Sequence, residues 1–221
     1  MAEELNLNSD VSIIPGVYDG GAMIIGMGGY DRNVGVCNLG TTAMFRSCSP
    51  DPLIDDPAQK RMQTYVLTSD RYATGGAMNN AGVMLRWFRD NLSGDKSYPE
   101  ITEAAEEIEP GSDGLFCFPF LTGERDPRIG NKASASFFGM KEYHTFGHMS
   151  RALPEGIGYS LNLMKEVLEE NEVRVNEIVV GGSGSKDDLW CQILADIFNI
   201  RTVRSVTRDS TMVGGAILAF T

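Results

Sequence analysis

The chain has 221 residues, of which 42% are hydrophobic and 22% are charged, so it can form the core of one large domain or two small ones. Its net charge is −11 at pH 7 and its pI is about 4.6, which argues against a nucleic-acid partner because such proteins need a clustered basic face. An acidic chain can still bind an anionic nucleotide through backbone N–H groups, helix N-termini and Mg²⁺.

The cysteines give no sign of a metal centre or of a disulfide framework. They are far apart and form neither a CxxC motif nor a pair with histidine spacing, so we expect buried free thiols at Cys37, Cys48, Cys117 and Cys191. The sequence has no apolar run near the roughly 20 residues of a membrane span, and its N-terminus does not resemble a signal peptide. We therefore expect a cytoplasmic protein with no membrane partner.

The first half of the chain is predicted to be rich in strands. The strands expected from apolar runs cover, in chain order, residues 11–19, 34–40, 43–48 and two runs within 62–76. A small-residue helix or turn is expected over residues 20–29, and a loop rich in proline and aspartate over 49–57. The second and third of these strands would pair as a hairpin that turns at Thr41 and Thr42.

The second half alternates helices with strands. Helices are expected over residues 79–92, 103–109, 148–170, 187–198 and from 212 onward, and strands over 115–121, 176–182 and 201–206. The longest helix is amphipathic, with apolar residues every three or four positions, and Pro154 is expected in its first turns. The two halves together predict an α/β domain around a mixed sheet. Both ends of the chain look abrupt, which suggests a fragment.

Gly40, Thr41 and Thr42 form the tip between two apolar strands, and this tip is the first candidate phosphate site. A glycine leaves backbone N–H groups open to an anion, and threonine hydroxyls can donate hydrogen bonds to phosphoryl oxygens. A plain hairpin turn explains the same residues. The tip alone therefore leaves both interpretations open.

A second candidate is the Gly-Gly-Ser-Gly segment at 181–184, where a predicted strand runs into a predicted helix. Small residues permit close approach of a ligand, and a helix N-terminus supplies free donors and the positive end of its dipole. The segment lacks the GK[ST] ending of a Walker loop and the third glycine of GxGxxG. A tight turn capped by Asp187 or Ser185 is the alternative interpretation.

Asp19, which ends a predicted strand and precedes two glycines, is the third candidate. A carboxylate there can accept a proton from a substrate hydroxyl, but a helix cap or an Asx turn is the simpler explanation for a lone aspartate. The Glu-Arg-Asp run at 124–126 could orient a substrate, although a surface ion pair is the commoner arrangement.

Taken in order, these segments resemble the C-terminal half of the FGGY family of carbohydrate kinases, from about residue 13 to residue 220. The Gly-Glu-Arg loop and the Leu-Trp-x-Gln-x-x-Ala-Asp helix are the specific motifs, whereas the glycine turns are weak ones. The segments that carry the resemblance are Gly-Val-Tyr-Asp-Gly-Gly at 16–21, Asn-Leu-Gly-Thr-Thr at 38–42, Gly-Gly at 75–76, Asn-Asn-Ala-Gly at 79–82, Gly-Glu-Arg at 123–125, Gly-Gly at 181–182 and Leu-Trp-Cys-Gln-Ile-Leu-Ala-Asp at 189–196.

The resemblance implies an actin-like, ribonuclease-H-like fold in which ATP binds between two domains, with only the second domain present over residues 1–221. In such kinases the aspartate in the place of Asp19 is the base that accepts the proton of the sugar hydroxyl. The tip at Gly40, Thr41 and Thr42 lies beside the β- and γ-phosphates.

The resemblance also implies nucleotide contacts from three other segments. Gly82 and Arg86 fall where a glycine and often a glutamine contact the nucleotide. Gly182 and Ser183 lie at the phosphates, and Asp187 lies at the adenine or ribose. Arg86 can still form a hydrogen bond in place of glutamine.

Several positions depart from the family pattern. Ser183 stands where glycine is frequent, which narrows the approach of a ligand, and Asp187 stands where Asn or Ser is commoner. After the Gly-Glu-Arg loop the family often continues with Ala-Arg-Gly, whereas this chain has Ala-Ser-Ala at 133–135.

The expected activity is transfer of the γ-phosphoryl group of ATP, with Mg²⁺, to a hydroxyl of a sugar or sugar acid, with gluconate ahead of xylulose. An N-terminal kinase domain would supply most contacts with the sugar, so the chain alone is expected to be inactive. The alternatives are a nucleotide-binding remnant or half of a split gene, a non-catalytic module that forms a homodimer through the exposed cleft face, and an α/β domain that binds no nucleotide.

Overall fold

The computed structural model of the chain describes residues 4–8, 10, 14–31, 33–207 and 209–220. The helices are α1 (Asp19–Gly26), α2 (Gly82–Leu92), α3 (Tyr98–Glu106), α4 (Phe146–Glu170), α5 (Asp188–Phe198) and α6 (Ser210–Phe220), with short 3₁₀ helices η1 (Ser112–Gly114) and η2 (Ser183–Lys186). The strands are β1 (Val34–Leu39), β2 (Ala43–Ser49), β3 (Gln63–Thr68), β4 (Arg71–Met78), β5 (Phe116–Phe118), β6 (Ser136–Phe138), β7 (Glu177–Gly181) and β8 (Arg201–Arg204).

A six-stranded mixed sheet forms the centre of the molecule, in the order β3-β4-β2-β1-β7-β8. The β1–β2 and β3–β4 hairpins are antiparallel, and β7 and β8 continue the sheet in parallel with β1. The mixed sheet and the hairpin, both predicted from the sequence, are confirmed, and the last strand, β8, lies at an edge of the sheet. Because β1 and β7 are parallel neighbours, their C-terminal ends lie at the same edge of the sheet.

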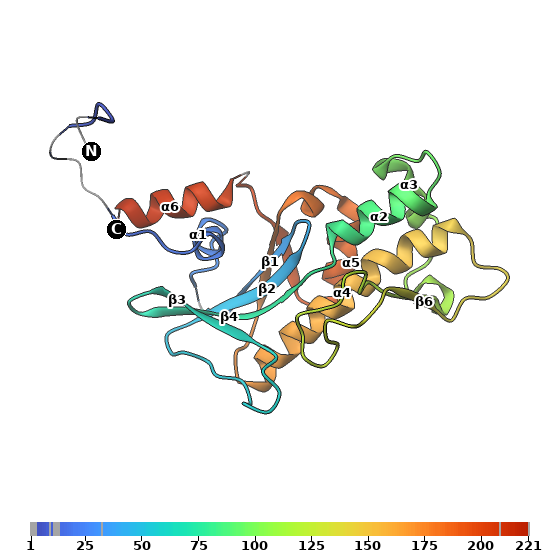
Figure 1. Cartoon of the computed structure of the whole chain (residues 1–221), viewed down its shortest axis with the longest axis horizontal. Coiled ribbons are helices and arrows are strands. Elements are labelled where there is room, and N and C mark those ends of the chain that lie inside the picture. Colours follow the sequence, from blue (N-terminus) through green and yellow to red (C-terminus); the bar gives the residue numbers. More distant parts are fainter. Residues whose placement is uncertain (1–3, 9, 11–13, 32, 208, 221) are drawn as a thin grey trace.

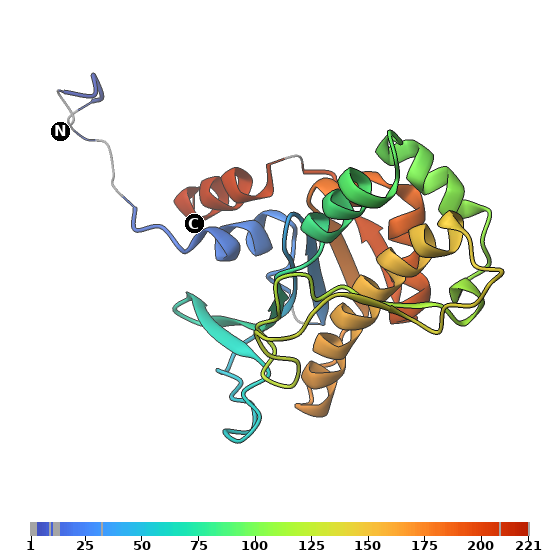
Figure 2. The same cartoon turned by 45° about the vertical axis from the view of Figure 1, so that its right-hand side comes forward.

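Helices cover both faces of this sheet (Figure 1 and Figure 2). The buried strand β2 shows why, because its alternate residues point into two different cores. Phe45 packs in the larger core with residues of α4 and α5, whereas Met44 and Cys48 pack in a second core with Ile24 and other residues of α1. Helices α1 and α6 lie side by side on that second face.

Glycines allow α1 and α6 to touch through their backbones. A Cβ atom on Gly26 would collide with the Ser210 carbonyl oxygen, and one on Gly214 would collide with the Ala22 carbonyl oxygen. Such close approach is possible only without side chains at the crossing. The contact fixes the position of α1, whose first residue is Asp19.

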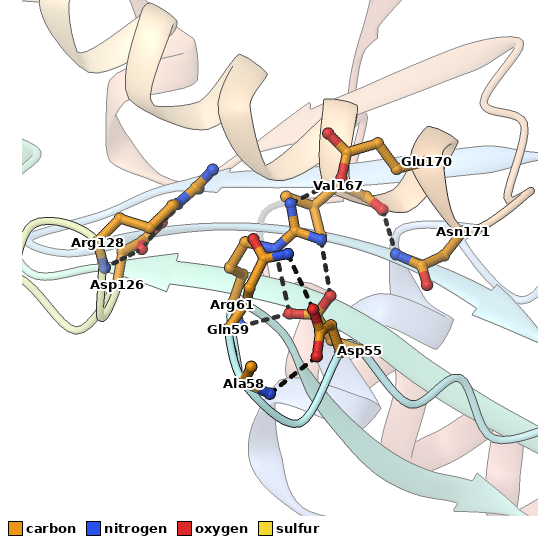
Figure 3. Close-up of polar contacts among 10 residues, drawn as sticks. Asp55, Ala58, Gln59, Arg61, Asp126, Arg128, Val167, Glu170 and Asn171 are labelled. Atoms are coloured by element: carbon orange, nitrogen blue, oxygen red, sulfur yellow. Dashed lines mark hydrogen bonds and ion pairs between the residues drawn. The ribbon is translucent and has the colours of Figure 1, made fainter.

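The loop between β2 and β3 is tied to the C-terminal end of α4 by a buried arginine (Figure 3). The Arg61 guanidinium donates to both carboxylate oxygens of Asp55, at 2.8 and 3.2 Å, and to Glu170 at 2.6 Å. The side chains of Arg61 and Asp55 are only 8% and 3% exposed. The Arg61–Glu170 contact therefore holds this long loop against α4, while Asp55 fixes the guanidinium within the loop.

The structure differs from the prediction at α1, α2, α3 and α4, and three of these differences concern where a helix begins. The strand predicted over residues 11–19 is absent from 14–18, and Asp19 instead begins α1, since the Tyr18 carbonyl accepts the N–H groups of Gly21 and Ala22; residues 11–13 lie outside the described part. The acidic helix begins at Tyr98 rather than 103, because Ser97 and Glu100 form a capping box.

The other two differences concern α2 and α4. Helix α2 begins three residues later than predicted, at Gly82, because the two preceding asparagines are engaged with another loop. Pro154 lies inside α4 rather than in its first turns. All four thiols are free, as predicted, but only Cys37, Cys48 and Cys117 are buried, and Cys191 is partly exposed. Burial raises the pKa of both Cys48 and Cys117 to about 12. Within the described residues, no helix has the length and apolar character needed to cross a bilayer.

Candidate functional site

The two glycine bends singled out in the sequence lie next to each other. The register of β1 and β7 pairs Asn38 with Gly181, so the bends that follow the two strands begin beside each other. Gly182 has φ +85°, and a Cβ atom there would lie 2.5 Å from the Leu39 carbonyl oxygen and 2.7 Å from Asn38 Oδ1. Only glycine fits this backbone conformation and this close contact.

The hairpin tip is attached to the start of α2 through its carbonyl groups. The Gly82 N–H donates to the Gly40 carbonyl at 2.9 Å, and the Val83 N–H donates to the Thr41 carbonyl at 3.1 Å. The side chains of Thr41 and Thr42 are exposed and have no hydrogen-bond partner among the described residues. Their hydroxyls are therefore free to donate to a ligand.

Gly82 has a packing role at this junction. A Cβ atom on it would lie 2.6 Å from the Gly40 carbonyl oxygen, so glycine allows α2 to begin directly against the tip. Because its N–H is already donated to Gly40, Gly82 cannot donate a hydrogen bond to a ligand. It can only let a ligand approach its backbone closely. Arg86 lies one turn further on the same helical face, is exposed, and has no polar partner among the described residues.

A cavity of about 840 Å³ opens beside the second bend. It brings together residues from the ends of β1, β7 and β8 and from the first turns of η2, α1 and α6. Its described lining residues are Met23, Asn38, Gly181, Gly182, Ser183, Ser185, Lys186, Arg204, Ser205, Val206, Thr207, Asp209, Ser210 and Thr211. The hydroxyl groups and backbone amides of this lining suit a polar, anionic ligand.

Asp19 is exposed at the N-terminus of α1, where its Oδ1 accepts a hydrogen bond of 2.7 Å from the Gly20 N–H. Residues four positions apart share a helical face, so Asp19 lies one turn from Met23, which lines the 840 Å³ cavity. The first turn of a helix favours a negative charge. The carboxylate is therefore accessible, one helical turn from a residue that lines the cavity.

Asp187 is the N-cap of α5, as the alternative interpretation predicted. Its Oδ1 accepts the Trp190 N–H at 2.9 Å, and its Oδ2 accepts the Thr102 hydroxyl at 2.6 Å. It lines a separate cavity of only about 20 Å³, with residues of α2, α3 and α4. The predicted nucleotide residues thus fall on two sides of η2, with Gly182 and Ser183 on one side and Asp187 on the other.

Gly123 and Glu124 of the Gly-Glu-Arg loop are buried, whereas Arg125 is exposed, and Glu124 is held by hydrogen bonds rather than by the surface ion pair of the alternative interpretation. Glu124 is 4% exposed and accepts the Asn79 N–H at 2.8 Å and the Asn80 Nδ2–H at 2.7 Å. Asp126 is the residue that pairs with an arginine, Arg128, at 2.5 Å. The contact between this loop and the two asparagines before α2 could not be predicted, because no local sequence pattern joins them.

Residues 35–221 match the family described as "FGGY family of carbohydrate kinases, C-terminal domain". The chain is similar to a gluconokinase of Bacillus licheniformis, with 31% identity over 99% of this chain and 44% of that protein. Among solved structures it is similar to a xylulose kinase and a gluconate kinase of Lactobacillus acidophilus, with TM-scores of 0.92 and 0.91 and 30% identity to each, over 99% of this chain and 44% of each of theirs.

The chain spans less than half the length of these relatives. Over that span the likeness extends through every element of the mixed sheet and its flanking helices, which confirms the actin-like, ribonuclease-H-like fold implied by the sequence motifs. The match to the family covers both glycine bends and the loop that holds Glu124. The chain therefore belongs to the FGGY family of carbohydrate kinases and corresponds to its C-terminal domain.

Proposed function

We propose that residues 1–221 are the nucleotide-binding domain of an ATP-dependent carbohydrate kinase that works with an N-terminal sugar-binding domain. The observation that carries the proposal is the pair of adjacent bends, one with two free threonine hydroxyls and the other beside an 840 Å³ cavity. The names of the relatives support a sugar or sugar acid as acceptor. We place gluconate ahead of xylulose. A cytoplasmic location fits an enzyme that consumes ATP.

Phosphoryl transfer needs positioning and charge neutralisation more than covalent chemistry. In the proposed reaction, the hydroxyls of Thr41 and Thr42 and the backbone around Gly182 and Ser183 hold the phosphate oxygens. Asp19 accepts the proton of the attacking sugar hydroxyl. Gly82, Arg86 and Asp187 contact the adenosine end, on the other side of η2.

Mg²⁺ would supply additional neutralisation of the phosphate charge. Among the described residues, no group of three or more His, Cys, Asp or Glu side chains could hold a metal ion by itself. Mg²⁺ in kinases is usually held by one or two carboxylates together with phosphate oxygens and water. Phosphate oxygens and water would supply most ligands of the ion, which leaves Asp19 free to accept the proton of the sugar hydroxyl.

Calorimetric titration of ATP into the purified chain tests the proposal. We expect a Kd below about 1 mM, and an affinity roughly tenfold weaker for a Thr41→Val/Thr42→Val variant, because two charge-assisted hydrogen bonds are lost. Ser136→Ala, which removes an exposed hydroxyl on β6, serves as the matched control. An absence of ATP binding together with tight dimers would favour the interaction module instead.

A further inference from the structure

Arg46 is a buried cation without a charged partner. It lies on β2, faces α1, and is 6% exposed. Its Nη1 donates one hydrogen bond of 3.3 Å, to the hydroxyl of Tyr18, while its buried Nε has no partner. No carboxylate of the described residues lies within ion-pair distance of it. A buried charge of this kind is costly and is usually balanced by an anion.

The surroundings of Arg46 hold the guanidinium without neutralising it. The guanidinium carbon lies 4.6 Å from the ring centre of Tyr65 and 6.0 Å from that of Tyr18, and the two rings stack at 4.8 Å. Gly75 pairs with Arg46 on the neighbouring strand, and a Cβ atom there would lie 2.8 Å from the Arg46 Cα. The site is therefore shaped around this side chain, with aromatic faces that compensate only part of the charge.

The guanidinium lies against the first turn of α1. A Cβ atom on Gly20 would be 3.6 Å from Arg46 Nη1, and Gly20 directly follows the proposed base Asp19. The Tyr18 hydroxyl accepts the hydrogen bond from Nη1, so its own O–H is left to donate. Burial raises the pKa of Tyr18, so this hydroxyl stays protonated at neutral pH.

We propose that Arg46 and Tyr18 bind the carboxylate of a sugar-acid substrate next to Asp19. The inference rests on the proposed kinase function and favours a sugar acid over a neutral sugar as its substrate. A carboxylate supplies the anion that Arg46 lacks, whereas a neutral ketose does not. Free guanidinium N–H groups and the Tyr18 O–H provide charge-assisted and neutral donors to the same anion. The relatives named for gluconate and xylulose are about equally similar to this chain, at 31% and 30% identity, so they do not make this selection.

A carboxylate could also come from an aspartate or glutamate of the N-terminal domain. That source has the same chemistry but needs no substrate, so the two sources predict different responses to a free sugar acid. The neighbouring strand provides an internal comparison. Arg71 on β4 also lies over a tyrosine ring, at 5.2 Å from Tyr30, and also has a buried unpartnered Nε, but it pairs with Asp70 at 3.2 Å.

The test is a nitrogen-15 NMR titration of the 221-residue chain that follows the arginine Nε–Hε signals. Gluconate is compared with gluconamide, which replaces the carboxylate with a neutral amide on the same carbon chain. We expect gluconate to shift the Arg46 signal and leave the Arg71 signal in place, and gluconamide to bind at least about tenfold more weakly. Arg46→Gln and Tyr18→Phe should each weaken gluconate binding, and Arg46→Lys should restore part of it.

Three results would overturn the inference: an Arg46 signal that gluconate does not move, an equal response to gluconamide, or an equal response to acetate. The first of these would favour a carboxylate from the N-terminal domain. If a variant fails to fold, as judged by its thermal unfolding, the titrations of the unmodified chain with gluconate and gluconamide still test whether Arg46 binds the carboxylate. ATP is titrated into the same sample: ATP binding without a gluconate response removes only this inference, whereas loss of ATP binding removes the kinase function itself.

Discussion

Gly182 shows how one residue serves both the fold and the site. Its positive φ turns the chain out of β7, and its missing side chain lets this bend lie against the end of β1. The same missing side chain leaves the backbone N–H groups of the bend open to a ligand. Substitution here therefore affects stability and ligand binding together.

Gly182→Ala should lower the free energy of unfolding by about 2 kcal/mol and weaken ATP binding, because the new Cβ would press on the Leu39 carbonyl. Thermal unfolding and calorimetry measure the two effects. Gly94 is the matched control, since it also has a positive φ of +66° but no neighbouring atom within 4 Å of the place where a Cβ would lie. Gly94→Ala should cost only about 1 kcal/mol and leave ATP affinity unchanged.

Asp19→Asn tests the proposed proton transfer. In the kinase formed with the N-terminal domain, we expect kcat to fall at least about 100-fold, because the amide cannot accept the hydroxyl proton. ATP affinity should stay within about twofold, since Asp19 does not contact the nucleotide in the proposed arrangement. A variant with near-normal kcat would show that Asp19 is not the base.

At the scale of elements, the chain joins segments through a few buried polar contacts. The loop before β3 is held to α4 by Arg61, and the hydrogen bond from Arg61 lowers the pKa of Asp55. A carboxyl whose pKa is lower in the folded state stabilises the fold above its unfolded pKa of about 3.9, and this contribution disappears as the pH falls through the folded value.

Asp55→Asn should therefore lower the stability at pH 7 by about 2 kcal/mol, or the Tm by about 5 °C. The difference from the unmodified chain should shrink as the pH falls from about 4, the unfolded pKa, through the lower folded pKa of Asp55, because the carboxylate is then protonated. Thermal unfolding monitored by circular dichroism between pH 7 and pH 3 measures it. Asp51→Asn, an exposed position in the same loop, should show no such dependence, and a constant difference for Asp55→Asn would contradict the assignment.

The elements that were predicted well have strong local patterns. The periodicity of α4 and the two apolar runs of the hairpin required no knowledge of the rest of the fold. The strand predicted before Asp19 failed because apolar residues alone do not make a strand without a neighbouring strand to pair with. Helix α3 was misplaced although its start was signalled by Ser97 and Glu100.

In the candidate site, too, local features could be predicted from the sequence and non-local contacts could not. Each glycine bend is a local feature and could be identified from the sequence. The contacts that support the bends are not local, because Glu124 reaches Asn79 across 45 positions and Thr102 reaches Asp187 across 85. A single sequence carries no signal for such pairs.

At the scale of the whole molecule, the cavity and the bends lie on a chain that spans 44% of its relatives' length. We expect the purified chain to bind ATP without phosphorylating gluconate or xylulose, because the proposed two-domain kinase takes the opposing wall of the cleft and most sugar contacts from its other domain. A coupled assay for ADP release measures this, with the ATP titration as a check that the chain is folded. Sugar phosphorylation by the chain alone would contradict the two-domain proposal.

The hydrogen bonds from Gly82 and Val83 to the hairpin tip link two of the proposed nucleotide-binding segments. They join the helix that carries Arg86 directly to the tip that carries the threonines at 41 and 42. A nucleotide that contacts both segments would therefore bind to one connected unit. The affinity for its base and the affinity for its phosphates would then be coupled. Removal of either the base or the phosphates from the nucleotide would weaken the binding of the part that remains.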